Sequence, residues 1–196
     1  NIHDIDKIIF IDDTFNAVKS RFKDMCHMFS KYDFEWFSFL RVQFVDEETV
    51  RLMKESGCKA VYLGIESANE VVLKNMNKNA TPDQFMRGIK LLKKYDIASV
   101  AAFIIGFPGE TEKSIDNNIE FIETSGIDFY TLKEFYYMQH TSVYERRNEF
   151  GLSGIGSKWE HSTMDYMTAY NMKIKMFQSI KNSVFIDADT SLWYIA

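Results

Sequence analysis

Short apolar segments that end in polar residues recur along the chain, and they constrain its fold more than any other feature. The clearest spans residues 8–11 and is followed by Asp12 and Asp13. A segment this short and this rich in β-branched residues favours a buried strand over a helix. The same pattern recurs at residues 36–40, 60–65, 100–105 and, more weakly, 129–132.

Helix signals separate these predicted strands. Thr81 and Pro82, with Gln84 shortly after, predict a helix N-terminus with a capping box. Thr111 and Gly126 predict the start and the end of another helix. Strands that alternate with helices predict parallel β-α units joined by right-handed crossovers. We therefore predict an α/β fold, a partial TIM-type barrel of parallel strands. The carboxyl ends of these strands would lie at one end of the barrel and hold the functional residues.

The same pattern divides the chain into two parts. Residues 1–134 contain all the predicted barrel strands. Residues 135–196 are predicted to form a C-terminal helical extension, which begins as a loop and continues with a long helix from Ser162 or Thr163. Strand-like segments at residues 184–186 and 192–195 follow this helix without a termination signal.

Composition and charge narrow the classes of function. Of the 196 residues, 46% are hydrophobic, which is enough to bury one sizeable core. A net charge of -5 without a basic stripe predicts no nonspecific nucleic-acid partner. No apolar run approaches the roughly 20 residues of a membrane helix, so we predict no membrane partner and a cytoplasmic location. Cys26 and Cys58 are too few for a disulfide framework, which fits a reducing compartment.

Polar motifs follow the predicted strands in a fixed order, and together they carry a family resemblance. They are Asp12-Asp13-Thr14, Arg41, Gly64-Ile65-Glu66-Ser67 and Gly106-Phe107-Pro108-Gly109-Glu110-Thr111. This series resembles the radical S-adenosylmethionine (radical SAM) superfamily, and within it the cobalamin-binding-domain class of Fe-S oxidoreductases. The resemblance covers residues 8 to about 134 and implies strands two to six of a (β/α)6 barrel.

The resemblance also implies an activity and its cofactors. The family uses a [4Fe-4S] cluster to cleave S-adenosylmethionine reductively, which generates a radical or feeds a cobalamin-dependent methyl transfer. The implied small-molecule cofactors are therefore S-adenosylmethionine and the cluster, with cobalamin as a third in this class. The substrate is not implied, because loops and added segments choose it in such folds.

The sequence departs from the family at the cluster motif. The family's CxxxCxxC loop is absent, and Cys26 and Cys58 do not have its spacing. Cluster ligands are cysteine thiolates, so we expect this chain to be a truncated, inactive fragment that holds none of these cofactors tightly and no metal.

The resemblance assigns polar site residues, each with a structural alternative. Asp12 or Asp13 would receive the ammonium of S-adenosylmethionine, unless Asp13 caps a helix. Arg41 would bind the methionyl carboxylate, unless it pairs with Asp13 or Glu66. Glu66 would accept hydrogen bonds from the ribose hydroxyls or orient Arg41, and Ser67 would join it or cap the next helix.

The last motif would bind adenine. Gly106 and Phe107 would let the backbone approach a flat ring, and Ile104 would supply an apolar wall. Glu110 is predicted to be a first-turn helix acid rather than a ligand. His161, beside a tryptophan, is predicted to be a packing or surface residue rather than a substrate or metal contact.

Two other functions fit the residues. In the first, a barrel enzyme binds a divalent metal through Asp12, Asp13 and Glu66. In the second, the barrel is a non-catalytic interaction module with a sealed upper face. The resemblance also implies that the strand at residues 8–11 is paired on both edges in the intact family barrel, so in this fragment we expect one of its edges to be unpaired. We therefore expect a homodimer through this strand, or a tail around residues 184–186 that folds back over it.

Overall fold

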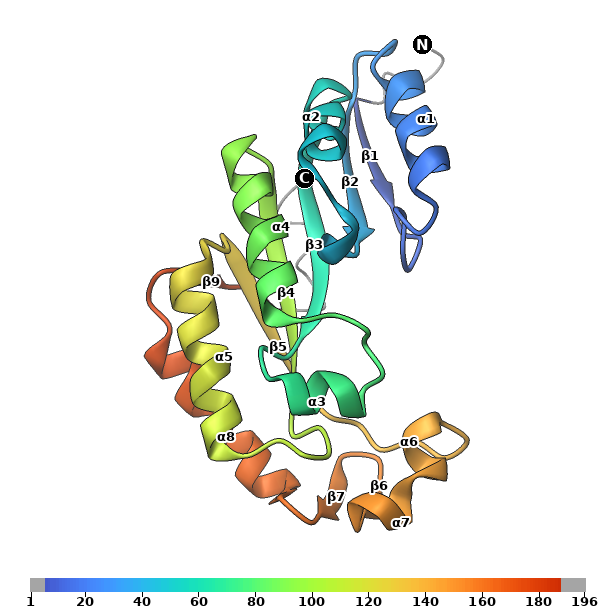
Figure 1. Ribbon diagram of the computed structural model, residues 1–196. Helices are drawn as coiled ribbons and strands as arrows, with labels where there is room; N and C mark the ends of the chain where they lie inside the picture. Colours follow the sequence, from blue (N-terminus) through green and yellow to red (C-terminus); the bar gives the residue numbers. More distant parts are fainter. Residues whose placement is uncertain (1–5, 188–196) are drawn as a thin grey trace.

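The computed structural model describes residues 6–187, and its centre is one parallel six-stranded sheet (Figure 1). The strand order is β1-β2-β3-β4-β5-β9. The bounds are Lys7–Phe10 for β1, Glu35–Leu40 for β2, Cys58–Glu66 for β3, Ala98–Ile105 for β4, Phe129–Glu134 for β5 and Val184–Phe185 for β9. Every neighbouring pair is parallel, which confirms the predicted α/β class and partial barrel. Within residues 6–187 the sheet is open, with β1 and β9 at its edges.

Helices form a layer against one face of the sheet, and the core lies between the two (Figure 1). The layer runs in the order α1 (Lys19–Phe29), α2 (Glu47–Glu55), α4 (Pro82–Lys94), α5 (Glu112–Ser125) and α8 (Tyr166–Ser179). The short helices η1 (Val42–Phe44) and α3 (Glu70–Asn75) lie in connections. Leu63, Ile65 and Phe103 are fully buried beneath this layer, whereas the alternating residues Tyr62 and Gly64 are only half-buried.

The predicted helix ends are confirmed where capping chemistry is strong. The Thr81 hydroxyl accepts a hydrogen bond from the Gln84 amide, and the Gln84 side chain accepts one from the Thr81 amide. Thr111 caps α5, and Gly126 ends it with a φ of +84°, a left-handed conformation that favours glycine. Ser67 does not cap the helix after β3, because Asn69 occupies that position.

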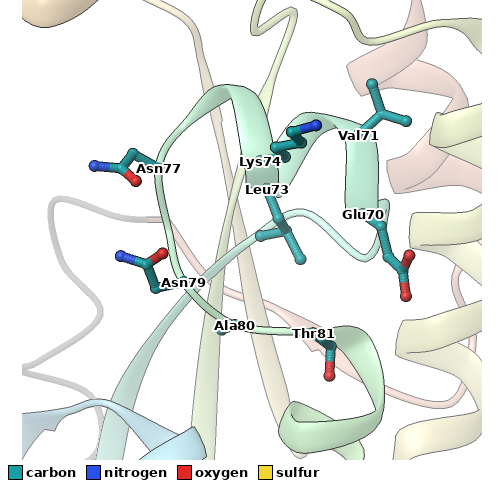
Figure 2. Close-up of a pocket in the computed structure, with 8 residues that line it drawn as sticks. All are labelled: Glu70, Val71, Leu73, Lys74, Asn77, Asn79, Ala80 and Thr81. Carbon is teal, nitrogen blue, oxygen red and sulfur yellow. The ribbon is translucent and has the colours of Figure 1, made fainter.

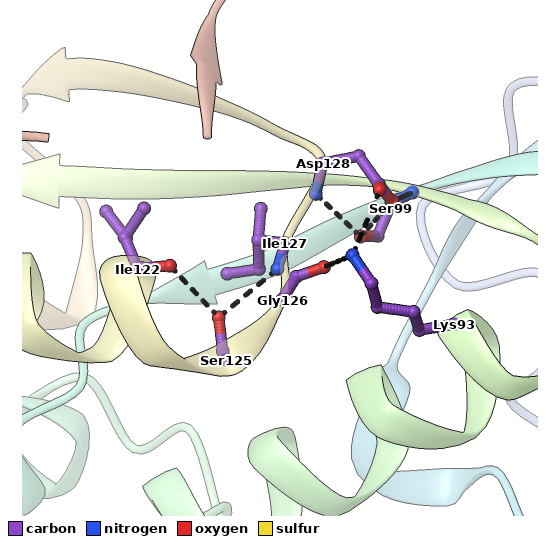
Figure 3. Close-up of polar contacts among 7 residues, drawn as sticks. All are labelled: Lys93, Ser99, Ile122, Ser125, Gly126, Ile127 and Asp128. Atoms are coloured by element: carbon purple, nitrogen blue, oxygen red, sulfur yellow. Dashed lines mark hydrogen bonds and ion pairs between the residues drawn. The ribbon is translucent and has the colours of Figure 1, made fainter. Parts of the chain in front are cut away.

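Side chains tie α4, α5 and the amino ends of β4 and β5 together (Figure 3). The Asp128 carboxylate accepts a hydrogen bond from the Ser99 amide at 2.9 Å and lies 3.7 Å from the Lys93 ammonium. Lys93 also donates to the Gly126 carbonyl at 3.2 Å. These contacts fix the amino ends of β4 and β5, which lie at the opposite end of the sheet from the strand carboxyl ends.

In the C-terminal part the helical segment expected around residues 143–149 is confirmed, whereas the small sheet and the start of the long helix differ from the prediction. This part contains α6 (Ser142–Glu145), α7 (Arg147–Phe150) and a small antiparallel sheet of β6 (Ser153–Ile155), β7 (Lys158–His161) and β8 (Met164–Asp165). The long helix therefore starts at Tyr166, capped by Asp165, and not at Ser162 or Thr163. The two short helices and the small sheet lie beyond the carboxyl ends of the parallel strands, at the bottom of Figure 1.

The end of the described chain joins the sheet at the edge opposite β1. Val184 and Phe185 pair with Phe129 and Tyr130 of β5. The expectation that residues 184–186 cover the first strand is therefore wrong. The predicted strand at residues 192–195 lies outside the described residues. No helix in the described part of the chain is long and apolar enough to cross a membrane.

Candidate cofactor-binding site

A cavity of about 450 Å³ lies at the carboxyl ends of β2, β3 and β4, on the face of the sheet that is opposite the helices. It brings together four of the predicted residues, namely Asp13, Arg41, Glu66 and Ile104. The other lining residues are Thr14, Phe39, Leu40, Tyr62, Gly64, Lys78, Ala102, Phe103 and Lys133. The lining combines apolar and aromatic side chains with both cationic and anionic ones.

The backbone around Arg41 is fixed by Asn16, a buried residue that sequence reasoning missed. The Asn16 side chain accepts a hydrogen bond from the Arg41 amide and donates one to the Arg41 carbonyl, each at 3.0 Å. The Arg41 guanidinium lies 5.9 Å from the centre of the Phe44 ring. These contacts join the loop after β1, which contributes Asp13, to the loop after β2.

Glu66 sits at a local break in the sheet and pairs with a lysine that sequence reasoning did not identify. Its φ is +66°, and the pairing register between β3 and β4 shifts between Gly64 and Glu66. The Lys78 ammonium lies 3.0 Å from the Glu66 carboxylate, and the exposed fractions of the two side chains are 13% and 22%. The partner of Glu66 in this ion pair is thus Lys78 and not Arg41.

The other predicted residues do not line this cavity. Asp12 is exposed to solvent. Ser67 is fully buried, and its hydroxyl accepts a hydrogen bond from the Asn69 amide at 3.1 Å. Gly106 and Phe107 directly follow β4 and are buried outside the cavity lining. The Phe107 ring packs edge-on against the Phe135 ring, with 5.3 Å between the ring centres. The structure therefore separates the adenine motif from the cavity, except for Ile104.

Glu110 is a buried carboxylate and not the first-turn helix acid that was predicted. It precedes the cap of α5, and its side chain turns inward. One oxygen accepts a hydrogen bond from the Gly106 amide at 2.5 Å, and the other accepts one from the Asn118 side chain at 3.2 Å. Burial raises the pKa of Glu110 to about 7. One feature of the sequence could have indicated this buried carboxylate. Asn118 is a polar residue on the otherwise apolar stripe of Ile115 and Ile122, and it needs a polar partner there.

His161 holds the same glycine from the opposite side. Its Nε2 atom lies 3.0 Å from the Gly106 carbonyl oxygen, and its ring stacks on Trp159 at 5.1 Å. Burial lowers the pKa of His161. The Trp159 indole in turn donates to the Phe135 carbonyl at 2.7 Å. The predicted packing role of His161 therefore fits its position.

A second cavity, of about 420 Å³, lies between α3 and the start of α4 (Figure 2). Glu70 and Lys74 contribute charges from α3, and Asn77 and Asn79 line it from the following loop. Both asparagines have positive φ, of 55° and 51°, which their short polar side chains tolerate. The residues that line this cavity include none of the predicted site residues.

The described residues do not fit an iron-sulfur cluster or a metal ion. Within residues 6–187, no three His, Cys, Asp or Glu side chains gather closely enough to hold a metal. Cys26 and Cys58 are buried, and burial raises the pKa of Cys26 to about 11 and that of Cys58 well above its ordinary value. Buried protonated thiols are poor metal ligands.

Comparison with known protein families gives one match that covers more than half of the chain. The profile described as "Radical SAM superfamily" matches residues 4–122. An uncharacterized methyltransferase of Pyrococcus horikoshii is 37% identical over 127 residues, which are 64% of this chain and 28% of that protein. The bacteriochlorophyllide d C-12(1)-methyltransferase of Chlorobaculum tepidum is 30% identical over 122 residues, or 61% of this chain and 27% of that protein. The chain thus spans little more than a quarter of the length of these relatives.

Solved structures show the same fold at low sequence identity. The archaeal Elp3 of Methanocaldococcus infernus superposes with a TM-score of 0.69 over 94% of this chain and 48% of its own, at 16% identity. TsrM of Kitasatospora setae is a radical S-adenosylmethionine methyltransferase that was solved with cobalamin and a [4Fe-4S] cluster bound. It superposes with a TM-score of 0.66 over 74% of this chain and 31% of its own, at 15% identity.

Proposed function

Because this chain belongs to the radical SAM superfamily, we propose that the cavity at the carboxyl ends of β2, β3 and β4 binds S-adenosylmethionine. The observation that carries the proposal is the convergence of Asp13, Arg41, Glu66 and Ile104 in one cavity. These residues come from four separate connections or strands, and a cofactor with several unlike functional groups needs such a mixed set of partners.

Each lining side chain suits one part of the cofactor. Arg41 binds the methionyl carboxylate, since a guanidinium offers paired donors to two oxygens. Glu66 accepts hydrogen bonds from the ribose hydroxyls, and Lys78 holds its carboxylate in place. Ile104 forms an apolar wall for adenine, and Asp13 attracts the ammonium. Asp12, Ser67, Gly106 and Phe107 do not line the cavity, so they are not direct ligands in this proposal.

The whole protein is proposed to transfer a methyl or methylthio group to an unidentified substrate. The names of the curated relatives support this class, since they include methyltransferases and a putative methylthiotransferase of Methanocaldococcus jannaschii. The [4Fe-4S] cluster supplies the electron for cleavage of S-adenosylmethionine, and cobalamin is a further cofactor in this proposal. Neither Cys26 nor Cys58 fits the cluster, so we assign no step through it to the described residues.

Two ligands that share a nucleoside test the cofactor assignment. S-adenosylmethionine has the methionyl carboxylate, whereas 5′-deoxyadenosine lacks it. In calorimetric titrations, Arg41→Ala should weaken binding of S-adenosylmethionine by about 1 to 3 kcal/mol and leave binding of 5′-deoxyadenosine unchanged. Glu66→Gln should weaken binding of both ligands, because both have the ribose hydroxyls.

Arg51→Ala is the matched control, because Arg51 lies in an exposed ion pair with Glu55 on α2. It should change neither affinity. If the wild-type chain bound neither ligand, the non-catalytic interaction module would become the better description. If both ligands bound and neither Arg41→Ala nor Glu66→Gln changed the affinities, these residues would be excluded from the site.

A further inference from the structure

A single buried carboxylate connects two of the strand ends that border the proposed cofactor cavity. Glu110 accepts one hydrogen bond from the Gly106 amide, directly after β4, and one from the Asn118 side chain. Asn118 extends the connection to β3, because its oxygen accepts hydrogen bonds from the Ala68 amide at 2.6 Å and the Ser67 hydroxyl at 3.3 Å. The chain of contacts therefore runs from the end of β4 through α5 to the end of β3.

The direction of these hydrogen bonds makes the connection depend on the charge of Glu110. Both groups that face its carboxylate are N–H donors, and an ionised carboxylate accepts from both. A protonated carboxyl group is neutral and one of its oxygens carries an O–H, so it is a weaker acceptor for both N–H groups. Asn118 cannot rotate to present its oxygen, because that oxygen already accepts from Ser67 and Ala68. Protonation therefore removes the charge assistance from both hydrogen bonds and weakens the two links.

The links hold the segments that carry two residues of the cavity. Ser67 and Ala68 directly follow Glu66, and Gly106 follows Ile104 by two positions. We propose that Glu110 is a positioning residue that, in its ionised form, clasps the ends of β3 and β4 and so sets the spacing of Glu66 and Ile104. Protonation weakens the clasp and loosens the cavity. This consequence for ligand binding rests on the proposed function, whereas the clasp itself does not.

The surroundings of Glu110 place this change near neutral pH. Burial raises its pKa to about 7, while the hydrogen bonds from Gly106 and Asn118 favour the ionised form. The titratable group that faces the cluster from β7 is His161, which reaches the carbonyl side of Gly106. Burial lowers the pKa of His161. The remaining groups in these contacts, Asn118, Ser67 and the Ala68 amide, do not titrate.

Nuclear magnetic resonance of the amide protons tests the clasp without any ligand. The Gly106 amide proton should shift with pH in the wild-type chain, with a midpoint near 7, because its acceptor changes charge. Glu110→Gln should remove this titration, because the amide side chain does not ionise in this range. Glu112→Gln is the control, since Glu112 is exposed in the first turn of α5 and should leave the titration intact.

Binding of 5′-deoxyadenosine tests the consequence for the cavity. Its affinity should fall by about fivefold between pH 8 and pH 6 in the wild-type chain and stay constant in Glu110→Gln, at the weaker value. A wild-type Gly106 amide that does not titrate near neutral pH would overturn the clasp. A titrating amide with pH-independent binding would show that the clasp exists but does not set the cavity. Absence of binding at either pH would contradict the proposed function and leave the amide test valid.

Discussion

The Lys78 ammonium lies 3.0 Å from the Glu66 carboxylate, so the loop between α3 and α4 is anchored at the carboxyl end of β3. Both side chains line the cavity, and both are mostly shielded from solvent. The pair contributes to the fold and to the proposed ribose contact at the same time. Its two roles are separable by experiment.

Lys78→Met should lower the free energy of unfolding by about 1 to 3 kcal/mol, because it leaves the Glu66 carboxylate partly buried without its partner. Arg51→Met provides the comparison, since the Arg51–Glu55 pair on α2 is half exposed and should contribute about 0.5 kcal/mol or less. Urea unfolding of both variants measures the difference. Equal losses would show that the Lys78–Glu66 pair behaves as a surface pair.

Gly64→Ala should weaken nucleoside binding with little loss of stability. The added Cβ would lie 2.6 Å from the Glu66 carboxylate oxygen and 3.1 Å from the Lys78 nitrogen, and both are ends of flexible side chains that can move aside. Gly106→Ala should instead destabilise the fold by about 2 to 4 kcal/mol, because its Cβ would overlap the Trp159 ring and its φ is +87°. Thermal unfolding and 5′-deoxyadenosine titration of both variants should show these opposite patterns.

Glu110 should make the protein less stable as pH rises from about 4.5 to 7. Its pKa is raised from 4.5 to about 7, so the folded chain keeps a proton in this range that the unfolded chain has released. The contribution is on the order of 3 kcal/mol across the range, since each pKa unit corresponds to about 1.4 kcal/mol. Urea unfolding at several pH values should therefore fall more steeply with pH in the wild-type chain than in Glu110→Gln. Parallel curves would contradict the raised pKa.

Both cysteines should stay unreactive in the folded chain. Cys26 and Cys58 are buried and have raised pKa values, so Ellman's reagent should modify them only in denaturant. Anaerobic treatment with iron and sulfide, followed by desalting, should leave no charge-transfer absorbance. A stoichiometric [4Fe-4S] spectrum from this chain would contradict the assignment of both thiols as core residues.

The first strand should promote self-association. Within the described residues β1 is a terminal strand of the sheet and β2 is its neighbour, and such edge strands can pair with another chain. Light scattering over a concentration series should detect a dimer, and Ile9→Lys should shift it toward monomer. Ile155→Lys is the control, because Ile155 is an exposed apolar residue on the small sheet. A monomeric wild-type chain at all concentrations would exclude this edge as an interface.

The parallel sheet was predictable because its signals are local. Each strand is a short apolar run, and caps such as Thr81 and Thr111 satisfy backbone groups within their own first turn. The convergence of Arg41 and Glu66 followed from the rule that parallel strands present their carboxyl ends at one edge.

The remaining features depend on contacts between distant residues. The side chain of Glu110 looked like a helix-start acid, and only its position against Gly106 and Asn118 reveals burial. Lys78 reaches Glu66 across a loop with two left-handed asparagines, which no periodic pattern encodes. The small antiparallel sheet was missed because its strands are two to four residues long, too short for an alternating pattern to emerge.

Trp159 and Gly106 meet so closely that no side chain larger than hydrogen fits between them, although 52 positions separate them in the sequence. This contact seats the small sheet on the end of a central strand of the barrel. The C-terminal segment is therefore not an independent module: replacing it with a sequence that lacks a matching aromatic ring would leave Gly106 without its packing partner.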